Sequence, residues 1–295
     1  SNPVPALGRL ESTNPCGEQW LHDGDVCNLG SINLAKFTEN GGINEKKLAY
    51  VTEMCVRMLD NVIDLTDFPV AKVNTTFRNN RRVGLGIMGF ADMLYQLKIA
   101  YDSEEGFAVA RKVMKLINET AHKYSEQLAT EKGCFPNWEI SIYGPKGKNT
   151  KKRNAALTTI APTGSISMLV DCSSGVEPFF ALSYYKEVLN GQKLIYINDH
   201  LEKTLKQLGL WNEEIIKQIG KAGSVKNIAE IPENIRKIFV TAMDITADDH
   251  IKMQSTFQEY VDNSISKTIN FPHSATREDV KQGYIMAWEQ GLKGC

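Results

Sequence analysis

The stretch Asn14-Pro15-Cys16-Gly17-Glu18 places a thiol between an amide and a carboxylate, with a proline and a glycine beside the thiol. In an extended loop, residues two apart project to the same side. We therefore expect Asn14, Cys16 and Glu18 to face one ligand together, as a hydrogen-bond donor, a sulfur centre and a general base. A cysteine nucleophile in hydrolysis is one interpretation of this loop, although none of the five histidines is an evident base for it.

A second cysteine, Cys27, opens the stretch Cys27-Asn28-Leu29-Gly30-Ser31-Ile32-Asn33-Leu34. The six cysteines are scattered, at positions 16, 27, 55, 134, 172 and 295, and none forms a C-x-x-C pair. This spacing argues against a disulfide framework and against a structural zinc site. We therefore expect no metal site, and we expect any cysteine chemistry to be catalytic or redox. Cys55, Cys134 and Cys172 are interpreted as structural.

Two long segments repeat apolar residues at three- and four-residue intervals, which predicts helices that each bury one face. The first covers residues 44–63, and its predicted buried stripe is Leu48, Val51, Cys55, Met58, Leu59 and Val62. The second begins near Asp102, which has capping-box spacing to Glu105, and ends at Gly133. Its predicted stripe is Phe107, Ala110, Met114, Ile117, Ala121, Tyr124 and Leu128.

Shorter elements alternate with these helices. Leu189-Asn190-Gly191 predicts a hairpin between strands at 183–188 and 192–197, because Asn-Gly suits a type I′ turn. Further helices are expected at 200–208, 212–221, 246–261 and 276–292, and further strands at 155–160 and 267–271. Strands alternating with long helices indicate an α/β fold with mainly parallel pairing. We expect one structural unit, with the basic segment 146–153 as a solvated loop and the only plausible hinge.

The stretch Gly84-Leu85-Gly86-Ile87-Met88-Gly89 matches the G-x-G-x-x-G dinucleotide pattern, and Asp102 lies near the distance expected of a ribose-binding acid. However, the polar run 78–82 precedes it instead of a buried strand, and the pattern should form the first turn of a βαβ unit. We therefore predict close packing at a strand-to-helix turn here, and no nucleotide cofactor.

A more informative segment is Ala161-Pro162-Thr163-Gly164-Ser165-Ile166-Ser167, which follows a predicted strand and opens an apolar helix. Free backbone N–H groups, hydroxyls and the positive end of a helix form an anion site. The alternative is an ordinary N-cap. Glu177, in the tight loop at the other end of that helix, is as readily structural as functional.

The charge balance restricts the partners. With 34 basic and 35 acidic residues the net charge is −1, so no global field recruits a nucleic acid polymer or an anionic membrane. Any affinity for phosphate must come from a local site. No apolar run approaches the roughly 20 residues of a membrane span, and the first residues carry no signal segment. We expect a cytoplasmic globular protein.

Seven stretches, taken in order, resemble the large subunit of ribonucleotide reductase over essentially the whole chain. They are 14–18, 27–34, 81–92, 161–167, 173–178, 262–272 and 287–294. The form of residues 14–18, their spacing to Cys27 and the stretch 262–270 most resemble the adenosylcobalamin-dependent class. The resemblance implies part of a ten-stranded α/β barrel, with residues 13–28 as its central finger loop.

The resemblance also implies roles for the site residues. Cys16 carries a thiyl radical at the tip of the finger loop, Glu18 deprotonates the 3′-hydroxyl of the substrate and Asn14 hydrogen-bonds the ribose. Cys27 is one of two thiols that reduce the intermediate by forming a disulfide. The substrate phosphates are expected at Pro162, Thr163, Gly164, Ser165 and Ile166. The implied reaction reduces ribonucleotides to 2′-deoxyribonucleotides, with adenosylcobalamin as cofactor and an external dithiol such as thioredoxin as reductant.

By the same resemblance, residues 1–295 are the C-terminal portion of the barrel domain. The N-terminal half, with the partner thiol of Cys27 and much of the cobalamin surface, is an expected partner, and a final strand and cysteine tail are expected after Cys295. We expect the fragment to be inactive alone and the complete enzyme to be a homo-oligomer. Two alternatives stay open: the large subunit of the iron-dependent class I, and an inactive half-barrel scaffold.

Overall fold

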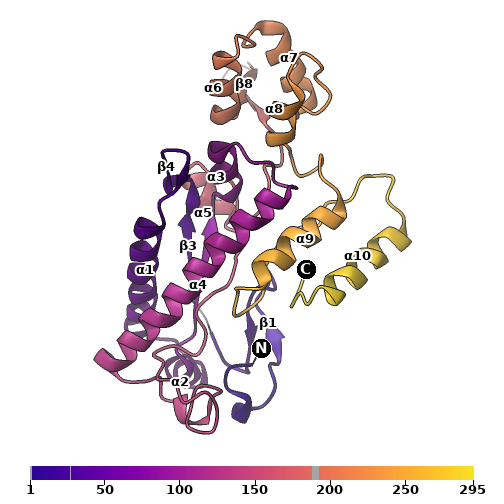
Figure 1. Ribbon diagram of the computed structural model, residues 1–295. Helices are drawn as coiled ribbons and strands as arrows, with labels where there is room; N and C mark the ends of the chain where they lie inside the picture. The colour runs from indigo at the N-terminus through magenta and orange to yellow at the C-terminus, as the bar shows by residue number, and fades with distance from the viewer. Residues whose placement is uncertain (1, 27, 188–192) are drawn as a thin grey trace.

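The computed structural model describes residues 2–26, 28–187 and 193–295, without the side chains of 185–195, and is built around a short parallel sheet (Figure 1). Strand β3 (Asn28–Asn33) pairs in parallel with β6 (Val83–Met88), with Asn28 opposite Val83. Parallel bridges join Leu85 to Thr158 and Ile160 to Ile265, so two further extended segments continue the sheet beyond β6. The expected parallel pairing is therefore present in this sheet, although the other three strand pairs among the described residues are antiparallel. Among the described residues the sheet does not close, and the ten-strand count stays a prediction.

Strand β6 is buried along its whole length, and its glycines let the neighbouring segment approach closely. A Cβ atom on Gly86 would lie 2.2 Å from the carbonyl oxygen of Thr159. Gly89, with φ of 71°, makes the turn into α3 (Phe90–Leu97), where a left-handed conformation favours glycine. The predicted close packing is confirmed. However, the first two glycines lie within a buried strand, which the sequence did not predict.

Helix α1 (Glu45–Leu65) packs against α4 (Glu104–Lys132) and against both β3 and β6. Its extent was predicted to within two residues, and the Asn44 side chain caps it by accepting a hydrogen bond from the Lys47 N–H. The predicted stripe is wrong in part, because Met58 and Val62 are exposed. The face that is buried is lined by Leu48, Thr52, Val56, Leu59, Asp60 and Ile63. Apolar residues lie on two adjacent faces of α1, and periodicity alone does not choose between them.

Helix α4 buries all seven residues of its predicted stripe and ends at Gly133, as predicted. The predicted capping residue, Asp102, is wrong. The N-cap is Ser103, whose hydroxyl accepts a hydrogen bond from the Gly106 N–H. The Ser103 side chain thus pairs with a free N–H group of the first turn, whereas Asp102 lies one residue further from the helix.

The hairpin of β7 (Ser183–Glu187) and β8 (Lys193–Ile197) is antiparallel, as predicted, while its predicted turn 189–191 lies outside the described residues. Figure 1 shows this hairpin grouped with α6 (Asp199–Gln207), α7 (Glu213–Ala222) and α8 (Glu233–Ile238), away from α1 and α4. This group encloses a second apolar core that includes Leu201, Leu205, Ile215, Ile219 and Val225. Helices α9 (Ala247–Gln258) and α10 (Arg277–Glu289) match the remaining two predicted helices.

Several elements differ from the predictions. The apolar helix predicted to open at residues 161–167 is α5 (Gly164–Leu169). The sequence did not predict α2 (Ala71–Asn80), α8, the β4 (Thr38–Glu39) and β5 (Gly42–Ile43) pair, or the 3-10 turns Pro5–Leu7, Leu34–Lys36 and Trp138–Ile140. The strand expected at 267–271 is wrong, since the paired residue is Ile265. The segment 146–153 is not simply a solvated loop: Lys152 is buried and donates a hydrogen bond to Glu126, and Arg153 pairs with Asp60.

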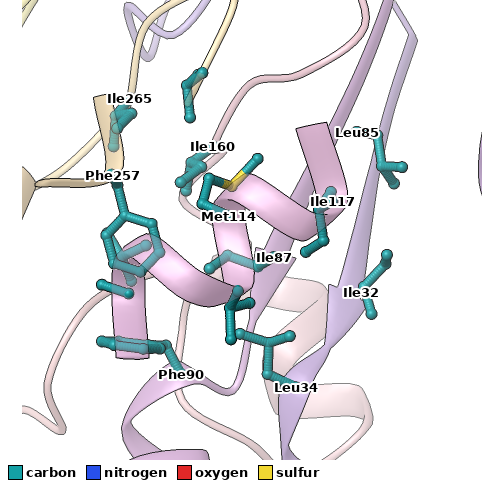
Figure 2. Close-up of a cluster of buried hydrophobic side chains, with 14 of the residues drawn as sticks. Ile32, Leu34, Leu85, Ile87, Phe90, Met114, Ile117, Ile160, Phe257 and Ile265 are labelled. Atoms are coloured by element: carbon teal, nitrogen blue, oxygen red, sulfur yellow. The ribbon is translucent and has the colours of Figure 1, made fainter. Parts of the chain in front are cut away.

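Figure 2 shows where the main core lies. Ile32 of β3, Ile87 of β6 and Ile117 of α4 belong to one cluster of buried side chains with Ile160 and Ile265, from the segments that extend the sheet. Each fully buried side chain of this size contributes about 1.5–3 kcal/mol relative to leaving it exposed. The core therefore fixes the strands on which the candidate site rests. None of the described helices is both long and apolar enough to cross a membrane.

Candidate active site

The Cys16 loop is the tip of a small hairpin. Strand β1 (Ser12–Thr13) pairs antiparallel with β2 (Trp20–Leu21). The Gly17 N–H donates to the Asn14 carbonyl at 3.0 Å, and the Gln19 N–H donates to Asn14 Oδ1 at 3.1 Å. Gly17 has φ of 80°, which favours glycine. Residues 14–18 therefore form a tight turn and not the extended loop we expected, because the Asn14 side chain closes on the backbone of Gln19.

The three predicted site residues differ in exposure. Cys16 is exposed at the tip, whereas Glu18 is only 1% exposed and its Oε2 has no hydrogen-bond partner among the described residues. Burying a carboxylate without a partner is costly, so this atom calls for a donor from a ligand or another segment. Asn14 Oδ1 closes the loop, so the donating Nδ2 is the part of its amide that can serve a ligand.

The hairpin is anchored to the sheet below it. The Glu18 carbonyl accepts hydrogen bonds from Thr159 Oγ1 at 2.8 Å and from the Ser264 N–H at 2.9 Å. At the base, Arg82 Nη1 donates to the Trp20 carbonyl at 2.7 Å, and Arg82 Nε lies 3.0 Å from Asp25 Oδ2. The loop is therefore held at two levels while its thiol stays open.

Sequence reasoning missed Gln19, whose side chain is fully buried beneath the loop. Neither of its amide atoms has a hydrogen-bond partner among the described residues. A Cβ atom on Gly84 would lie 2.7 Å from Gln19 Nε2, so the glycine in β6 makes the room for this side chain. Gly84 was the only sign of this buried side chain in the sequence. It was instead interpreted as part of the G-x-G-x-x-G nucleotide pattern.

Cys27 lies outside the described residues, so its role stays a prediction. The three cysteines predicted to be structural, Cys55, Cys134 and Cys172, are all half-buried. Burial raises the pKa of the Cys55 thiol, and burial together with the charge of Asp92 raises the pKa of Cys172 to about 11. A thiol with a raised pKa supplies little thiolate, which agrees with a structural role for both.

The expected phosphate segment forms the start of α5. Thr163 precedes this helix with φ of 58°, and its hydroxyl accepts a hydrogen bond from the Gly175 N–H at 2.7 Å instead of capping the helix. Gly164, Ser165 and Ile166 are exposed, Pro162 is half-buried and Thr163 is buried. The first turn of α5 is therefore open, and its N–H groups are not used by a side-chain cap.

The loop 173–178 is hydrogen-bonded to this segment. Ser174 Oγ lies 2.9 Å from Ser167 Oγ, and Lys267 Nζ donates to Glu177 Oε2 at 2.7 Å. Lys267 also lies 2.7 Å from His250 Nδ1. Burial, reinforced by the positive charge of Lys267, lowers the pKa of His250 to about 4. Glu177 is therefore the half-buried partner of a fully buried lysine, which favours a structural role.

One extended segment connects the two halves of the site. Thr159 holds the Glu18 carbonyl, and Thr163 lies four residues later at the start of α5. Four residues of extended chain span at most about 14 Å, so the Cα atoms of Thr159 and Thr163 lie no further apart than that. The Cys16 loop and the start of α5 are therefore joined through one short segment. Among residues 2–26, 28–187 and 193–295 no group of three or more His, Cys, Asp or Glu side chains is arranged to hold a metal ion.

Comparisons with known proteins match the whole chain. The family model of the ribonucleotide reductase barrel domain covers residues 1–295. The chain is 46% identical over 294 residues to a vitamin B12-dependent ribonucleoside-diphosphate reductase of Thermoplasma acidophilum, and that match covers 99% of the chain and 38% of the relative. It is 38% identical to a protein of the same name from Mycobacterium tuberculosis, covering 100% of the chain and 42% of the relative.

A solved structure agrees in fold. The alpha subunit of the Actinobacillus ureae class Id ribonucleotide reductase matches with a TM-score of 0.81 and 28% identity, covering 96% of the chain and 52% of that subunit. The chain therefore spans about two fifths of the length of its two curated relatives and about half of this structural one. Because the family model extends over all 295 residues, the chain belongs to the ribonucleotide reductase barrel-domain family.

Proposed function

We propose that the chain carries the radical cysteine of a ribonucleotide reductase, and that the complete enzyme reduces ribonucleotides to 2′-deoxyribonucleotides. The observation that carries this proposal is one anchored hairpin loop on which exposed Cys16 and buried Glu18 lie two residues apart. The membership of the family and the names of the relatives support the same reaction.

In the proposed reaction, the thiyl radical of Cys16 removes the hydrogen atom from C3′ of the ribose. The Glu18 carboxylate takes the proton of the 3′-hydroxyl while water leaves from C2′. Asn14 Nδ2 donates a hydrogen bond to the ribose. Two further thiols supply two electrons and two protons and form a disulfide, and Cys16 returns its hydrogen atom to C3′. One ribonucleotide and two thiols thus give one deoxyribonucleotide, one disulfide and one water.

The substrate phosphates are proposed to bind at the start of α5. Exposed Gly164, Ser165 and Ile166 present backbone N–H groups, and the Ser165 hydroxyl adds a further donor. Thr163 and Pro162 shape the turn beneath them. Cys27 is proposed to be one of the two reducing thiols, with its partner in the N-terminal portion of the enzyme and an external dithiol such as thioredoxin restoring both.

Adenosylcobalamin is the proposed cofactor, because two of the relatives are named vitamin B12-dependent. It supplies radical chemistry when it is bound. The residues present fit such a group, since Cys16 is exposed at the tip of its hairpin and leaves its thiol open to a large cofactor. The tip of the hairpin would face the cofactor, and most of its binding surface is proposed to lie in the N-terminal portion. The large subunit of the iron-dependent class I is the alternative.

The N-terminal portion of the enzyme is the proposed partner. Among the described residues, β3 pairs with β6 alone, which leaves its other edge open. Around α5, four apolar side chains are exposed: Ile166, Met168, Leu169 and Val170. Open edges and grouped apolar side chains are usually covered in a stable protein. We therefore propose that the remainder of the barrel covers both.

The test is reconstitution. The purified chain, mixed with the N-terminal portion, a ribonucleotide and dithiothreitol, is expected to form deoxyribonucleotide only when adenosylcobalamin is added. Product formed with an iron-loaded radical subunit but not with adenosylcobalamin would assign the chain to the class I alternative. No product under either condition would contradict the proposed function.

A further inference from the structure

The carbonyl oxygen of Glu18 is the point at which the Cys16 loop meets the sheet. Thr159 Oγ1 donates to it at 2.8 Å, and the Ser264 N–H donates to it at 2.9 Å. These donors come from two different segments, which the Ile160 to Ile265 bridge holds side by side. A carbonyl oxygen has two lone pairs, so both are used here. The position of the Glu18 backbone is therefore set by the sheet and not by the loop alone.

Thr159 is itself held rigidly. It is fully buried, and its N–H donates to the Leu85 carbonyl at 3.1 Å. A Cβ atom on Gly84 would lie 2.7 Å from Thr159 Cγ2, and one on Gly86 would lie 2.2 Å from the Thr159 carbonyl oxygen. The two glycines of β6 therefore form the slot that holds Thr159. Its hydroxyl also lies 3.0 Å from the Ser264 carbonyl, so its single proton favours the closer Glu18 oxygen.

We propose that Thr159 is a positioning residue for the radical site, acting through the Glu18 carbonyl; this inference rests on the proposed function. The fixed carbonyl belongs to the residue whose carboxyl group is the proposed base, and Cys16 precedes it by two residues. The hydrogen bond from Thr159 to the loop ends on a backbone atom, the Glu18 carbonyl oxygen, so Thr159 has no chemical step of its own. Its hydroxyl sets where the carboxylate and the thiol stand relative to the substrate.

Three variants separate positioning from general stability. Thr159→Val removes the hydroxyl and keeps the shape, while Thr159→Ser keeps the hydroxyl and removes only the methyl group. The matched control is Thr52→Val, because Thr52 is also fully buried and its hydroxyl donates to a backbone carbonyl, that of Leu48, at 2.8 Å. Both residues of this hydrogen bond lie in α1, so the bond does not involve the Cys16 loop.

The experiment measures kcat and KM of the complete reductase, together with hydrogen exchange of the backbone amides of residues 14–19. Thr159→Val is expected to lower kcat about tenfold, with KM within about twofold, since a 1 Å misplacement alone can cost about 100-fold. The amides of 14–19 are expected to exchange faster. Thr159→Ser is expected to keep at least half of the wild-type kcat, and Thr52→Val to leave both kcat and loop exchange unchanged.

A Thr159→Val enzyme with wild-type kcat and wild-type loop exchange would overturn the inference. So would a Thr159→Ser enzyme as impaired as Thr159→Val, because methyl packing and not the hydroxyl would then be responsible. A wild-type enzyme without reductase activity defeats the proposed function instead. In that case the exchange measurement still decides whether Thr159 holds the loop.

Discussion

The chemistry proposed for this chain depends on residues whose surroundings differ although they are neighbours in the sequence. The pattern Asn14, Cys16 and Glu18 was sufficient to predict a site, because an amide, a thiol and a carboxylate in one short loop have few structural uses together. It did not predict that Glu18 is buried while Cys16 is exposed. Nor did it predict that Thr159 and Ser264, more than a hundred residues away in the sequence, hold the Glu18 backbone against the sheet.

Replacing Cys27 is expected to separate the radical step from the reduction. In Cys27→Ser, Cys16 still removes the 3′ hydrogen atom, but the dithiol that reduces the intermediate is lost. Substrate decomposition should then replace deoxyribonucleotide, as measured by chromatography of the reaction products. Normal product yield with dithiothreitol or thioredoxin would show that Cys27 is not part of the redox pair.

His250 is expected to make stability depend on pH. Its pKa is lowered to about 4 in the folded chain, against an ordinary value near 6.5. Between these pH values the unfolded chain binds the proton and the folded chain does not, so this contribution to stability is complete above pH 6.5 and is lost as pH falls toward 4. The loss is on the order of 3 kcal/mol.

The variant His250→Gln keeps an acceptor for Lys267 and a donor for the Ala242 carbonyl, but it has no proton to gain. Urea unfolding at pH 7 and pH 5 is expected to show a smaller fall in stability for this variant than for the wild type. An equal fall in both proteins would show that His250 does not carry the pH dependence.

Among the secondary-structure elements, the long helices were the most predictable. All seven predicted stripe residues of α4 are buried, because a helix of this length repeats its pattern often enough to define one face. Strand β6 was missed because its glycines matched a loop pattern, although each serves close strand packing. The turn of the Cys16 loop was missed for a different reason: the Asn14 side chain, and not a local backbone preference, closes it.

Adding a methyl group to β6 is expected to destabilise the sheet. In Gly86→Ala the new Cβ would lie 2.2 Å from the Thr159 carbonyl oxygen, so the two strands must separate. Overpacking of this kind costs about 1–3 kcal/mol. The control is Gly42→Ala, whose new Cβ would lie 3.8 Å from its nearest neighbour. Urea unfolding of both variants tests this, and equal stabilities would contradict the close strand packing.

The whole molecule is predicted to be incomplete as a catalyst. Among the described residues one edge of β3 is unpaired, and we expect this edge and the exposed apolar side chains around α5 to be covered in the complete enzyme. Alone, the chain is expected to bind a hydrophobic dye, to self-associate and to show no reductase activity. Adding the N-terminal portion should suppress the dye signal and give a defined complex in size-exclusion chromatography with light scattering. A well-behaved monomer of 33.0 kDa that ignores that portion and binds no dye would contradict the half-barrel account.

At the scale of the whole chain, the family could be predicted from the sequence but the complete strand pairing could not. The order of the seven matching stretches predicted the family, because separate motifs in one order constrain the complete fold. The two segments that extend the sheet beyond β6 were not predictable in detail. Thr158, Ile160 and Ile265 pair through isolated bridges and not through long regular strands.

The central claim is that Cys16 carries the radical, and the most direct measurement is the rate of deoxyribonucleotide formation by Cys16→Ser in the reconstituted enzyme. A serine hydroxyl does not readily form the radical, so activity should fall below about 1% of wild type, a loss of at least roughly 2.7 kcal/mol in barrier terms. Cys134→Ser, at a half-buried thiol outside the loop, is the matched control and should keep wild-type activity. Activity of Cys16→Ser above that level, with nucleotide binding intact, would contradict the assignment of Cys16.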